Sequence, residues 1–260
     1  ALGIPVAHVE SGLRSGNRSM PEEKNRVATD RVSALLFCPT RTAVRNLRRE
    51  GRRTGIHPVG DVMLDALRAA APAARRRARR VLADLGLRRG AYVLATLHRQ
   101  ENVDRPARLA RLMTALSDLN DTVVFPAHPR TRARLRAARL WDRLSRTPRV
   151  RLVAPVGYLD FLALEMGARG ILTDSGGVQR EAYFLGVPCL LLRRETEWPE
   201  PVAAGATILA GDDPAAIRRA LSVLPRPIGE RGGVRGAALR QFGSGRAAAR
   251  IVKVITRWLR

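Results

Sequence analysis

Two carboxylates stand where the first apolar segment of this sequence gives way to a helical one. Glu10 follows the strand-like IPVAHV and is itself followed by Ser11 and Gly12, whereas Glu22 and Glu23 open the next helical segment. A pair of carboxylates near a strand end is suited to removing a proton and returning it. We therefore take Glu10 and Glu22 as candidate catalytic residues. For Glu23 we expect the ordinary role of a first-turn acid, which is to stabilise the helix dipole.

Histidine and arginine follow two later apolar segments. His98 and Arg99 come directly after AYVLATL, and His128 and Arg130 come after TVVFPA. Cationic groups at a strand end are suited to stabilising negative charge on a departing phosphate. His98 is the candidate for that role, with Arg99 as a candidate substrate contact. Arg99 and His128 are also weak candidates for contact with an allosteric effector.

A serine and two glycines connect a further strand-like segment, GILTD, to a helical one. This connection consists of Ser175, Gly176 and Gly177. Because these residues are small, their backbone N–H groups can approach a phosphate at the start of the helix. Glu181, about one turn further on, is placed to accept hydrogen bonds from ribose hydroxyls. This motif predicts a nucleotide-binding site.

Several other chemistries are excluded by the motifs that the sequence lacks. No GxGxxG follows a strand, no GxxxxGK[ST] occurs, and the spacing of histidine and cysteine fits no zinc site. We therefore expect no nicotinamide, no P-loop, no metal and no cofactor. Cys38 and Cys189 lie in apolar segments, which predicts buried free thiols and a cytoplasmic protein.

The elements that must position these residues alternate between short apolar runs and longer helical patterns. This alternation is typical of parallel βαβ units, and it predicts an α/β protein with two Rossmann-like domains. The first domain comprises residues 1–69 together with a C-terminal helix at about 244–260, and the second comprises residues 89–243. An Ala/Pro/Arg stretch at 69–80 marks the boundary. The first domain is expected to hold strands in 4–10, 35–40 and 56–60, and helices in 22–35, 41–51 (with Thr40 as N-cap) and 61–68. The second is expected to hold strands in 91–98, 122–128, 150–156, 170–174, 188–193 and 206–211, and helices in 106–119, 131–144, 158–168, 177–186, 199–204 and 213–224.

The composition is strongly basic, with a formal net charge of +24 over 260 residues. Such a charge raises nucleic acid as a partner. However, all but two of the 47 basic residues are arginine, spread along amphipathic segments with abundant alanine, and aromatic residues make up only 4%. We interpret this as a compositional bias and expect no nucleic-acid partner. No apolar run of membrane-spanning length occurs and Ala1 to Val6 lack signal-peptide features, so we expect no membrane association either. The final basic amphipathic helix is expected to pack on the body of the protein.

Taken together and in order, these motifs resemble the non-hydrolysing UDP-N-acetylglucosamine 2-epimerases over nearly the whole chain. The resemblance rests on HVESGLRS with MPEEKNRVATD, on TLHRQENVD, on TDSGGVQREAYFLGVPCLLLR and on TEWPEPVAAG. It implies a glycosyltransferase-B-like pair of Rossmann-type domains with the active site in the cleft. It also implies that His98 is the essential histidine, that Glu10 and Glu22 are the catalytic carboxylates, and that Ser175 and Glu181 bind the nucleotide. The implied substrate is a UDP-sugar and the implied reaction is an epimerisation at C2 through loss and re-addition of UDP.

The chain also departs from the family pattern. The family's GTRPE-like strand end and an Asp-bearing loop would precede Ala1, so we expect an N-terminally truncated first domain. We accordingly expect no appreciable epimerisation by the 260-residue chain, and a homodimer in the intact protein. Arg180 and Arg194 stand where many members have Glu and Asp, while Arg193 remains as a candidate substrate-binding residue.

Three alternatives stay open. A hydrolysing epimerase would release UDP and free N-acetylmannosamine, and it differs only in whether water reaches the intermediate. A glycosyltransferase of the same architecture would share the Ser-Gly-Gly and Glu181 features, but Glu10, Glu22 and His98 disfavour it. The third is an inactive basic remnant or nucleic-acid binder, for which steeply salt-dependent DNA binding without UDP binding would be the evidence.

Overall fold

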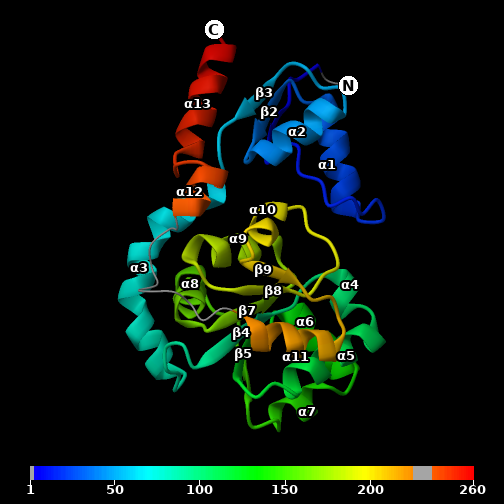
Figure 1. Cartoon of the computed structure of the whole chain (residues 1–260), viewed down its shortest axis with the longest axis vertical. Coiled ribbons are helices and arrows are strands. Elements are labelled where there is room, and N and C mark those ends of the chain that lie inside the picture. Colours follow the sequence, from blue (N-terminus) through cyan, green and yellow to red (C-terminus); the bar gives the residue numbers. More distant parts are fainter. Residues whose placement is uncertain (1–2, 225–235) are drawn as a thin grey trace. The chain divides into compact units, whose positions relative to one another are not determined.

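The computed structural model describes residues 3–224 and 236–260, which form two compact units. Unit 1 comprises Ala1–Ala69, Glu195–Glu200 and Val234–Arg260, and unit 2 comprises Ala70–Arg194 and Pro201–Gly233. Both units contain parallel sheets connected by helices, so the predicted α/β class with two Rossmann-like sheets is confirmed (Figure 1).

Unit 1 is built on a three-stranded parallel sheet in the order β1-β2-β3. Its central strand is buried at all four positions, as expected for a strand with a neighbour on each side. The strands are β1 (Ala7–Val9), β2 (Leu35–Cys38) and β3 (Ile56–Pro58); the helices that lie wholly within the unit are α1 (Pro21–Val32), α2 (Arg41–Arg49), α12 (Gly236–Phe242) and α13 (Ala247–Trp258). Thr40 caps α2 as predicted, because its side chain accepts a hydrogen bond from the Ala43 N–H.

Helix α13, at the C-terminal end of the chain, belongs to unit 1. Its apolar face places Ile251, Val254 and Ile255 against Leu35 and Phe37 of β2 (Figure 1). The prediction that this basic amphipathic helix packs on the body of the protein is therefore confirmed. Its cationic residues are exposed, and Arg250 also donates a hydrogen bond of 3.2 Å to the Val59 carbonyl.

Unit 2 contains a six-stranded parallel sheet in the order β6-β5-β4-β7-β8-β9. The chain runs outward from β4 through β5 to β6 and then returns to pair β7 with the other edge of β4. The strand order therefore reverses between β4 and β7, and in such sheets ligands bind at the carboxyl ends of the strands flanking the reversal. The strands are β4 (Tyr92–Thr96), β5 (Thr122–Pro126), β6 (Val150–Val153), β7 (Gly170–Thr173), β8 (Cys189–Leu191) and β9 (Thr207–Leu209).

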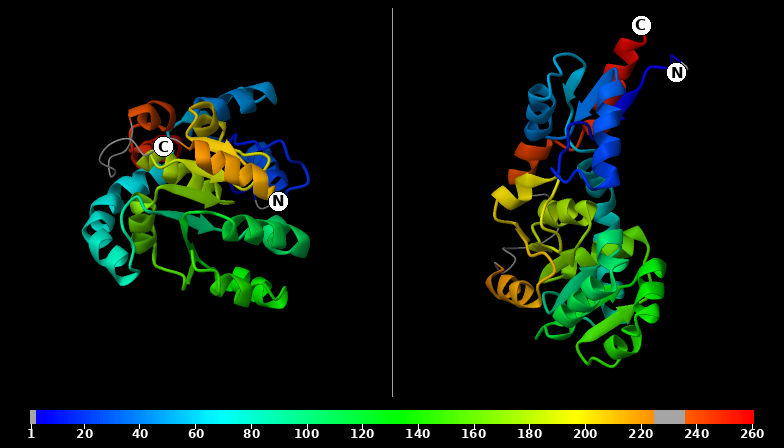
Figure 2. Two further views of the ribbon diagram at one scale, coloured as in Figure 1. Left: turned by 60° about the horizontal axis from the view of Figure 1, so that its bottom comes forward. Right: turned by 90° about the vertical axis from the view of Figure 1, so that its right-hand side faces the viewer.

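Both faces of this sheet are covered by helices (Figure 2). Alternate strand side chains such as Val93, Phe125 and Leu190 join helices α5 and α11 in the main core. On the other face, the Tyr92 hydroxyl donates a hydrogen bond to the Leu164 carbonyl of α8. The helices not yet named are α3 (Val62–Asp84), α4 (Gln100–Val103), α5 (Pro106–Ser117), α6 (Pro129–Ala137), α7 (Trp141–Ser145), α8 (Tyr158–Gly167), α9 (Gly176–Leu185), α10 (Pro199–Ala203) and α11 (Pro214–Val223).

The Ala/Pro/Arg stretch expected to end a helix is instead helical throughout. Helix α3 runs from Val62 to Asp84 with Pro72 inside it. Ala71, Ala74 and Val81 form a buried stripe along the helix, and alanine and arginine are strong helix formers. These contributions offset the hydrogen bond that an internal proline removes. The expected helix end near residue 68 is therefore wrong.

The helix expected over residues 131–144 is also wrong in detail, because it is divided in two. Arg139 adopts a left-handed backbone conformation with φ of 56°, which ends α6 and separates it from α7. The short helices α4 and α12 were not predicted from the sequence at all.

Both cysteines are free and buried, as predicted. Burial raises the pKa of Cys38 to about 12 and raises that of Cys189 further. Within the described ranges, no helix combines the length and apolarity needed to cross a bilayer.

Candidate active site

A buried aspartate organises the carboxyl ends of β4 and β7. Asp174 follows β7, is fully buried, and accepts hydrogen bonds from the backbone N–H groups of His98 (3.1 Å) and Arg99 (3.0 Å). The side-chain amide of Asn102 donates a third bond at 2.9 Å. These bonds fix the loop after β4 to the loop after β7. The importance of Asp174 and Asn102 was missed at the sequence level, although TDSGG places Asp174 directly before the Ser-Gly-Gly motif.

The same aspartate contacts the imidazole of His98. Nδ1 of His98 lies 3.1 Å from Oδ1 of Asp174, and the imidazole side chain is 49% exposed. Burial by itself raises the pKa of Asp174, but the hydrogen bond and charge of His98, with the bonds from Asn102 and Arg99, lower it below its ordinary value. An anionic Asp174 favours a proton on Nδ1 and leaves Nε2 as the nitrogen available to a ligand.

His98 and Ser175 line one cavity of about 210 Å³ within unit 2. Its walls combine a few polar groups with apolar side chains, which is typical of sites for small organic ligands. His128 also lines it, and its Nδ1 accepts a hydrogen bond from the Arg130 N–H at the start of α6. The remaining lining residues are Thr96, Leu97, Pro126, Pro155, Val156, Phe161 and Val178.

The predicted Ser-Gly-Gly motif forms the N-terminus of α9. Ser175 is the N-cap, and its hydroxyl accepts a hydrogen bond from the Val178 N–H at 3.3 Å. Gly176 and Gly177 occupy the first turn, where backbone N–H groups have no acceptor within the helix. Such a helix end attracts an anion through these donors and through the helix dipole.

Glu181 lies further along α9 and is nearly fully buried. It accepts a hydrogen bond of 2.8 Å from the hydroxyl of Tyr158, at the start of α8. Burial raises the pKa of the Tyr158 hydroxyl, and the neighbouring Glu181 raises it further. Burial, followed by the charge of Glu181, also raises the pKa of Glu165 well above the usual range for a carboxyl group. Both shifts favour the neutral forms of the Tyr158 hydroxyl and the Glu165 carboxyl group.

Arg193 follows β8 and is fully buried, with its Nε 4.0 Å from Oε1 of Glu101 in α4. Arg99 is the N-cap of α4 and gives its backbone N–H to Asp174. Three of the predicted residues, namely His98, Arg99 and Ser175, thus belong to the two loops that meet at the strand-order reversal. Gly176 and Gly177 begin α9 directly after the second loop.

The two candidate catalytic carboxylates belong to unit 1. Glu22 lies exposed in the first turn of α1. Glu10 directly follows β1 and has a left-handed backbone conformation, with φ of 67°. For a residue other than glycine this conformation costs about 1–2 kcal/mol, and it persists only where the surroundings impose it.

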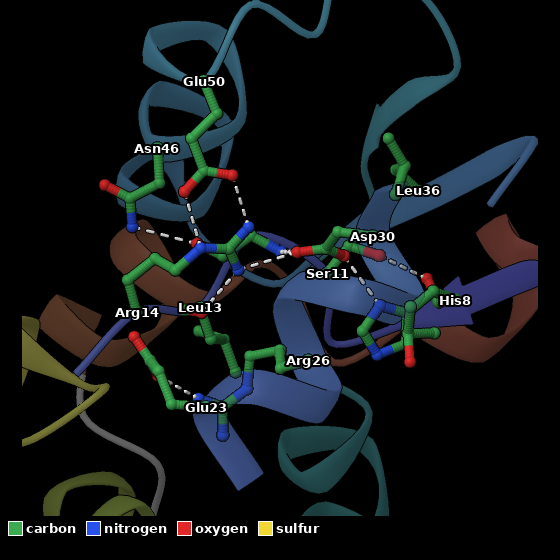
Figure 3. A network of polar contacts seen from close by, with 12 residues as sticks. His8, Ser11, Leu13, Arg14, Glu23, Arg26, Asp30, Leu36, Asn46 and Glu50 are labelled. Atoms are coloured by element: carbon green, nitrogen blue, oxygen red, sulfur yellow. Dashed lines mark hydrogen bonds and ion pairs between the residues drawn. The ribbon is translucent and has the colours of Figure 1, made fainter. Parts of the chain in front are cut away.

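Glu23 does more than stabilise the dipole of α1. Its buried carboxylate accepts hydrogen bonds from the backbone N–H groups of Ser15 (3.0 Å) and Gly16 (3.1 Å). Figure 3 shows its ion pair with Arg26, in which Nη1 of Arg26 lies 2.9 Å from Oε2 of Glu23. The acid therefore holds the loop between β1 and α1. No feature of the sequence indicates this role.

A second polar network in unit 1 centres on Asp30 and was not predicted. Asp30 is buried near the end of α1, and it contacts His8, Gly12 and Arg14 (Figure 3). Burial opposes its ionisation, but hydrogen bonds from His8, Arg14 and Gly12 outweigh that effect and lower the pKa of Asp30. The RVATD sequence carries no feature that distinguishes this aspartate from a surface acid.

Comparison with known proteins agrees with this geometry. The family model for UDP-N-acetylglucosamine 2-epimerase matches residues 1–256. A UDP-N-acetylglucosamine 2-epimerase homolog of Methanococcus maripaludis is 44% identical, with 98% of this chain and 69% of the relative aligned. A UDP-2,3-diacetamido-2,3-dideoxy-D-glucuronate 2-epimerase of Pseudomonas aeruginosa is 40% identical, with the same coverage of both chains.

Solved structures show the same fold. The Methanocaldococcus jannaschii UDP-GlcNAc 2-epimerase, crystallised with UDP-GlcNAc and UDP, is 41% identical and superposes with a TM-score of 0.87 over 98% of this chain and 69% of its own. The Neisseria meningitidis enzyme bound to UDP-GlcNAc is 30% identical, with a TM-score of 0.84 over 98% of this chain and 70% of its own. The motifs, the sheet topology and these likenesses agree, and the chain belongs to the UDP-N-acetylglucosamine 2-epimerase family.

Proposed function

We propose that this epimerase interconverts UDP-N-acetylglucosamine and UDP-N-acetylmannosamine by eliminating UDP and adding it back. The observation that carries the proposal is the meeting of the His98–Asp174 pair and the α9 N-terminus at the strand-order reversal of unit 2. This arrangement combines a site for phosphate with an imidazole beside it. Both are required when a nucleoside diphosphate is the leaving group.

The nucleotide is assigned to unit 2. The diphosphate takes the N–H donors of Gly176 and Gly177, because an anion is most favourable at the positive end of a helix. Glu181 accepts hydrogen bonds from the ribose hydroxyls and keeps its bond from Tyr158. Arg99 and the buried Arg193 add positive charge toward the diphosphate.

The chemistry begins with removal of the C2 proton by one carboxylate of the pair Glu10 and Glu22. The electron pair of the C2–H bond forms a C1=C2 double bond, the C1–O bond to UDP breaks, and 2-acetamidoglucal and UDP result. With protons on both ring nitrogens, His98 donates an Nε2–H hydrogen bond to the departing diphosphate and so stabilises the negative charge that develops on it. Re-addition of UDP at C1, with a proton delivered to the other face of C2, gives the epimer.

The test is to incubate the intact protein with UDP-N-acetylglucosamine in deuterated water and to analyse the products. UDP-N-acetylmannosamine carrying deuterium at C2 is the expected product. Free N-acetylmannosamine plus UDP would instead show the hydrolysing reaction. UDP-2,3-diacetamido-2,3-dideoxy-D-glucuronate, the compound named for the Pseudomonas relative, is tested in parallel. Turnover of that sugar alone would show that the assigned substrate is wrong.

Two variants test the residue roles. We expect His98→Asn to lower kcat by about 100-fold with a smaller change in KM, as for loss of one donor that stabilises developing charge. We expect Glu181→Ala to weaken UDP binding in calorimetry, since the ribose would lose its acceptor. Asp160→Asn is the matched control, because Asp160 is an acid of the same unit that pairs with Arg77 on the surface. Equal UDP affinity in Glu181→Ala and Asp160→Asn would refute the ribose assignment.

A further inference from the structure

The turn that carries Glu10 is bound on both flanks by one buried carboxylate. Oδ1 of Asp30 lies 2.7 Å from Nδ1 of His8, two residues before Glu10. Oδ2 of Asp30 accepts the N–H of Gly12, two residues after Glu10, at 3.0 Å, and it accepts a guanidinium N–H of Arg14 at 2.7 Å. We propose that Asp30 is a positioning residue that fixes this turn and so directs the Glu10 carboxylate at the C2 proton; this inference rests on the proposed function.

The backbone conformation of Glu10 is what makes such a clamp necessary. Within the described residues, Glu10 and Arg139 are the non-glycine residues with positive φ. A left-handed residue relaxes to an extended or helical conformation unless its neighbours are held in place. Relaxation at Glu10 would rotate the peptide planes on both sides and turn its side chain in a new direction.

Other contacts define where the turn lies. The Ser11 hydroxyl donates to the His8 carbonyl at 2.7 Å, and the Ser11 N–H donates to the Phe37 carbonyl of β2 at 3.1 Å. The Gly12 carbonyl accepts a bond of 2.9 Å from the Asn46 side chain of α2. These contacts join the turn to the sheet and to α2, whereas Asp30 joins the residues before and after Glu10 to each other through α1.

Asp30 is itself held in an ionised and oriented state. Arg14 places its guanidinium between Asp30 and Glu50, and it meets Glu50 through two bonds of 2.7 and 2.6 Å (Figure 3). Charge-assisted bonds of this kind are directional as well as strong. Glu50 is 43% exposed, so water screens its pair with Arg14, whereas the contact between Arg14 and the buried Asp30 is a separate bond that does not require Glu50.

The main test compares Asp30→Asn with the unaltered protein. The amide has nearly the same shape, but it replaces one acceptor oxygen by a donor and removes the charge. We expect kcat for C2 exchange to fall about 10- to 100-fold, because displacement of a reacting group by about 1 Å has a cost of that order. We expect KM and UDP affinity to change less than about threefold, since the nucleotide groups assigned above belong to unit 2. Asp30→Glu keeps the charge but shifts the carboxylate by one methylene. It should likewise lower kcat while KM changes little, and it replaces Asp30→Asn in this test if that variant does not fold.

Two control variants separate positioning from general stability. Ser33→Ala removes a buried hydrogen bond to Thr29 at the end of the same helix, without touching the turn. Glu50→Gln weakens the exposed end of the network. Both should keep kcat within about threefold of the unaltered protein. A loss of kcat in Ser33→Ala equal to that in Asp30→Asn would overturn the proposal.

A double-mutant comparison with Glu10→Gln tests whether Asp30 acts through Glu10. If it does, Asp30→Asn lowers kcat in the native background and changes it by less than about twofold in the Glu10→Gln background, because the effects of residues that act as a unit are not additive. Equal losses in both backgrounds would overturn the proposal. A Glu10→Gln variant with normal kcat would instead refute the proposed catalytic role of Glu10.

A structural readout does not depend on turnover. In Asp30→Asn the Gly12 amide loses its charged acceptor, so its hydrogen exchange should accelerate at least about tenfold, whereas Glu50→Gln should leave it unchanged. Unchanged protection of Gly12 in Asp30→Asn would show that the turn does not depend on Asp30.

Discussion

Glu165 offers a prediction in which stability depends on pH in the unusual direction. Its side chain is fully buried in α8, and among the described residues neither carboxyl oxygen has a hydrogen-bond partner. Burial, followed by the charge of Glu181, raises its pKa well above 4.5. The folded protein therefore retains a proton on Glu165 at pH values where the unfolded chain has released it.

The sign and size of the effect follow from proton linkage. Between the unfolded pKa and the folded pKa, the native state holds one more proton at this group than the unfolded state. The contribution of Glu165 to the free energy of unfolding therefore falls by about 1.4 kcal/mol for each pH unit in that range. An unpaired buried polar group costs a further ~1–3 kcal/mol at any pH.

The perturbation is Glu165→Met, which keeps the length of the side chain but removes both the titrating carboxyl group and the cost of burying its polar atoms. We expect the variant to be more stable than the native protein by about 1–3 kcal/mol near pH 4.5, where only the polar cost is relieved. The difference should widen as the pH rises from there. Glu165→Gln is the matched control, since it removes the titration but keeps a buried polar group.

The assay is urea unfolding at a series of pH values, followed by tryptophan fluorescence, in which Trp141 reports on unit 2 and Trp198 and Trp258 report on unit 1. Glu165→Met and Glu165→Gln should show the same pH dependence as each other and differ by a constant amount. If the native protein and Glu165→Met instead differ by a constant amount at every pH, Glu165 is not held in its protonated form. A Glu165→Met variant that is less stable throughout would show that the acid has a stabilising partner.

Three further predictions follow from the described contacts. Asp174→Asn should lower the free energy of unfolding by about 2–4 kcal/mol at pH 7, since an amide donor would face the N–H groups that the carboxylate now accepts. Because the folded pKa of Asp174 is lowered, the native protein should lose this advantage as the pH falls through that pKa, and acid titration of both proteins by circular dichroism would show the difference shrinking. Gly12→Ala should destabilise far more than Gly16→Ala in thermal unfolding: both have φ of 78°, but a Cβ at Gly12 would lie 2.3 Å from the Ala43 carbonyl oxygen, whereas Gly16 faces open space. Cys38 and Cys189 should react with a thiol reagent at pH 8 only after denaturant is added, and rapid labelling of the native protein would contradict their burial and raised pKa values.

Much of the architecture was predictable because it is written in local patterns. Runs such as AYVLATL and TVVFPA are nearly continuous in apolar residues and do not alternate with polar ones, which indicates parallel strands between helices. Ser175 and Thr40 precede helical segments with the side chains that cap a first turn, and both are N-caps in the structure. Polar residues after strands identified the end of the sheet at which His98 and Ser175 line one cavity.

Local patterns were misleading where packing outweighed propensity. Pro72 and the arginine run after it indicated a helix end, but buried Ala71, Ala74 and Val81 stabilise a continuous α3. Arg139 looked like an ordinary helical residue, yet it takes a left-handed conformation that divides α6 from α7. For α3 the outcome depends on surfaces contributed by other parts of the chain.

The sequence by itself determined the family, the parallel α/β class and the chemical types of the candidate residues, because strand patterns, caps and motifs are readable within a few neighbouring residues. Only the tertiary structure decided which acids organise the two loops. Asp174 binds the backbone of His98 across 76 positions of sequence, and Asp30 binds Gly12 across 18. An aspartate becomes such an anchor when folding removes it from water and surrounds it with donors, and no pattern of neighbouring residues records that environment.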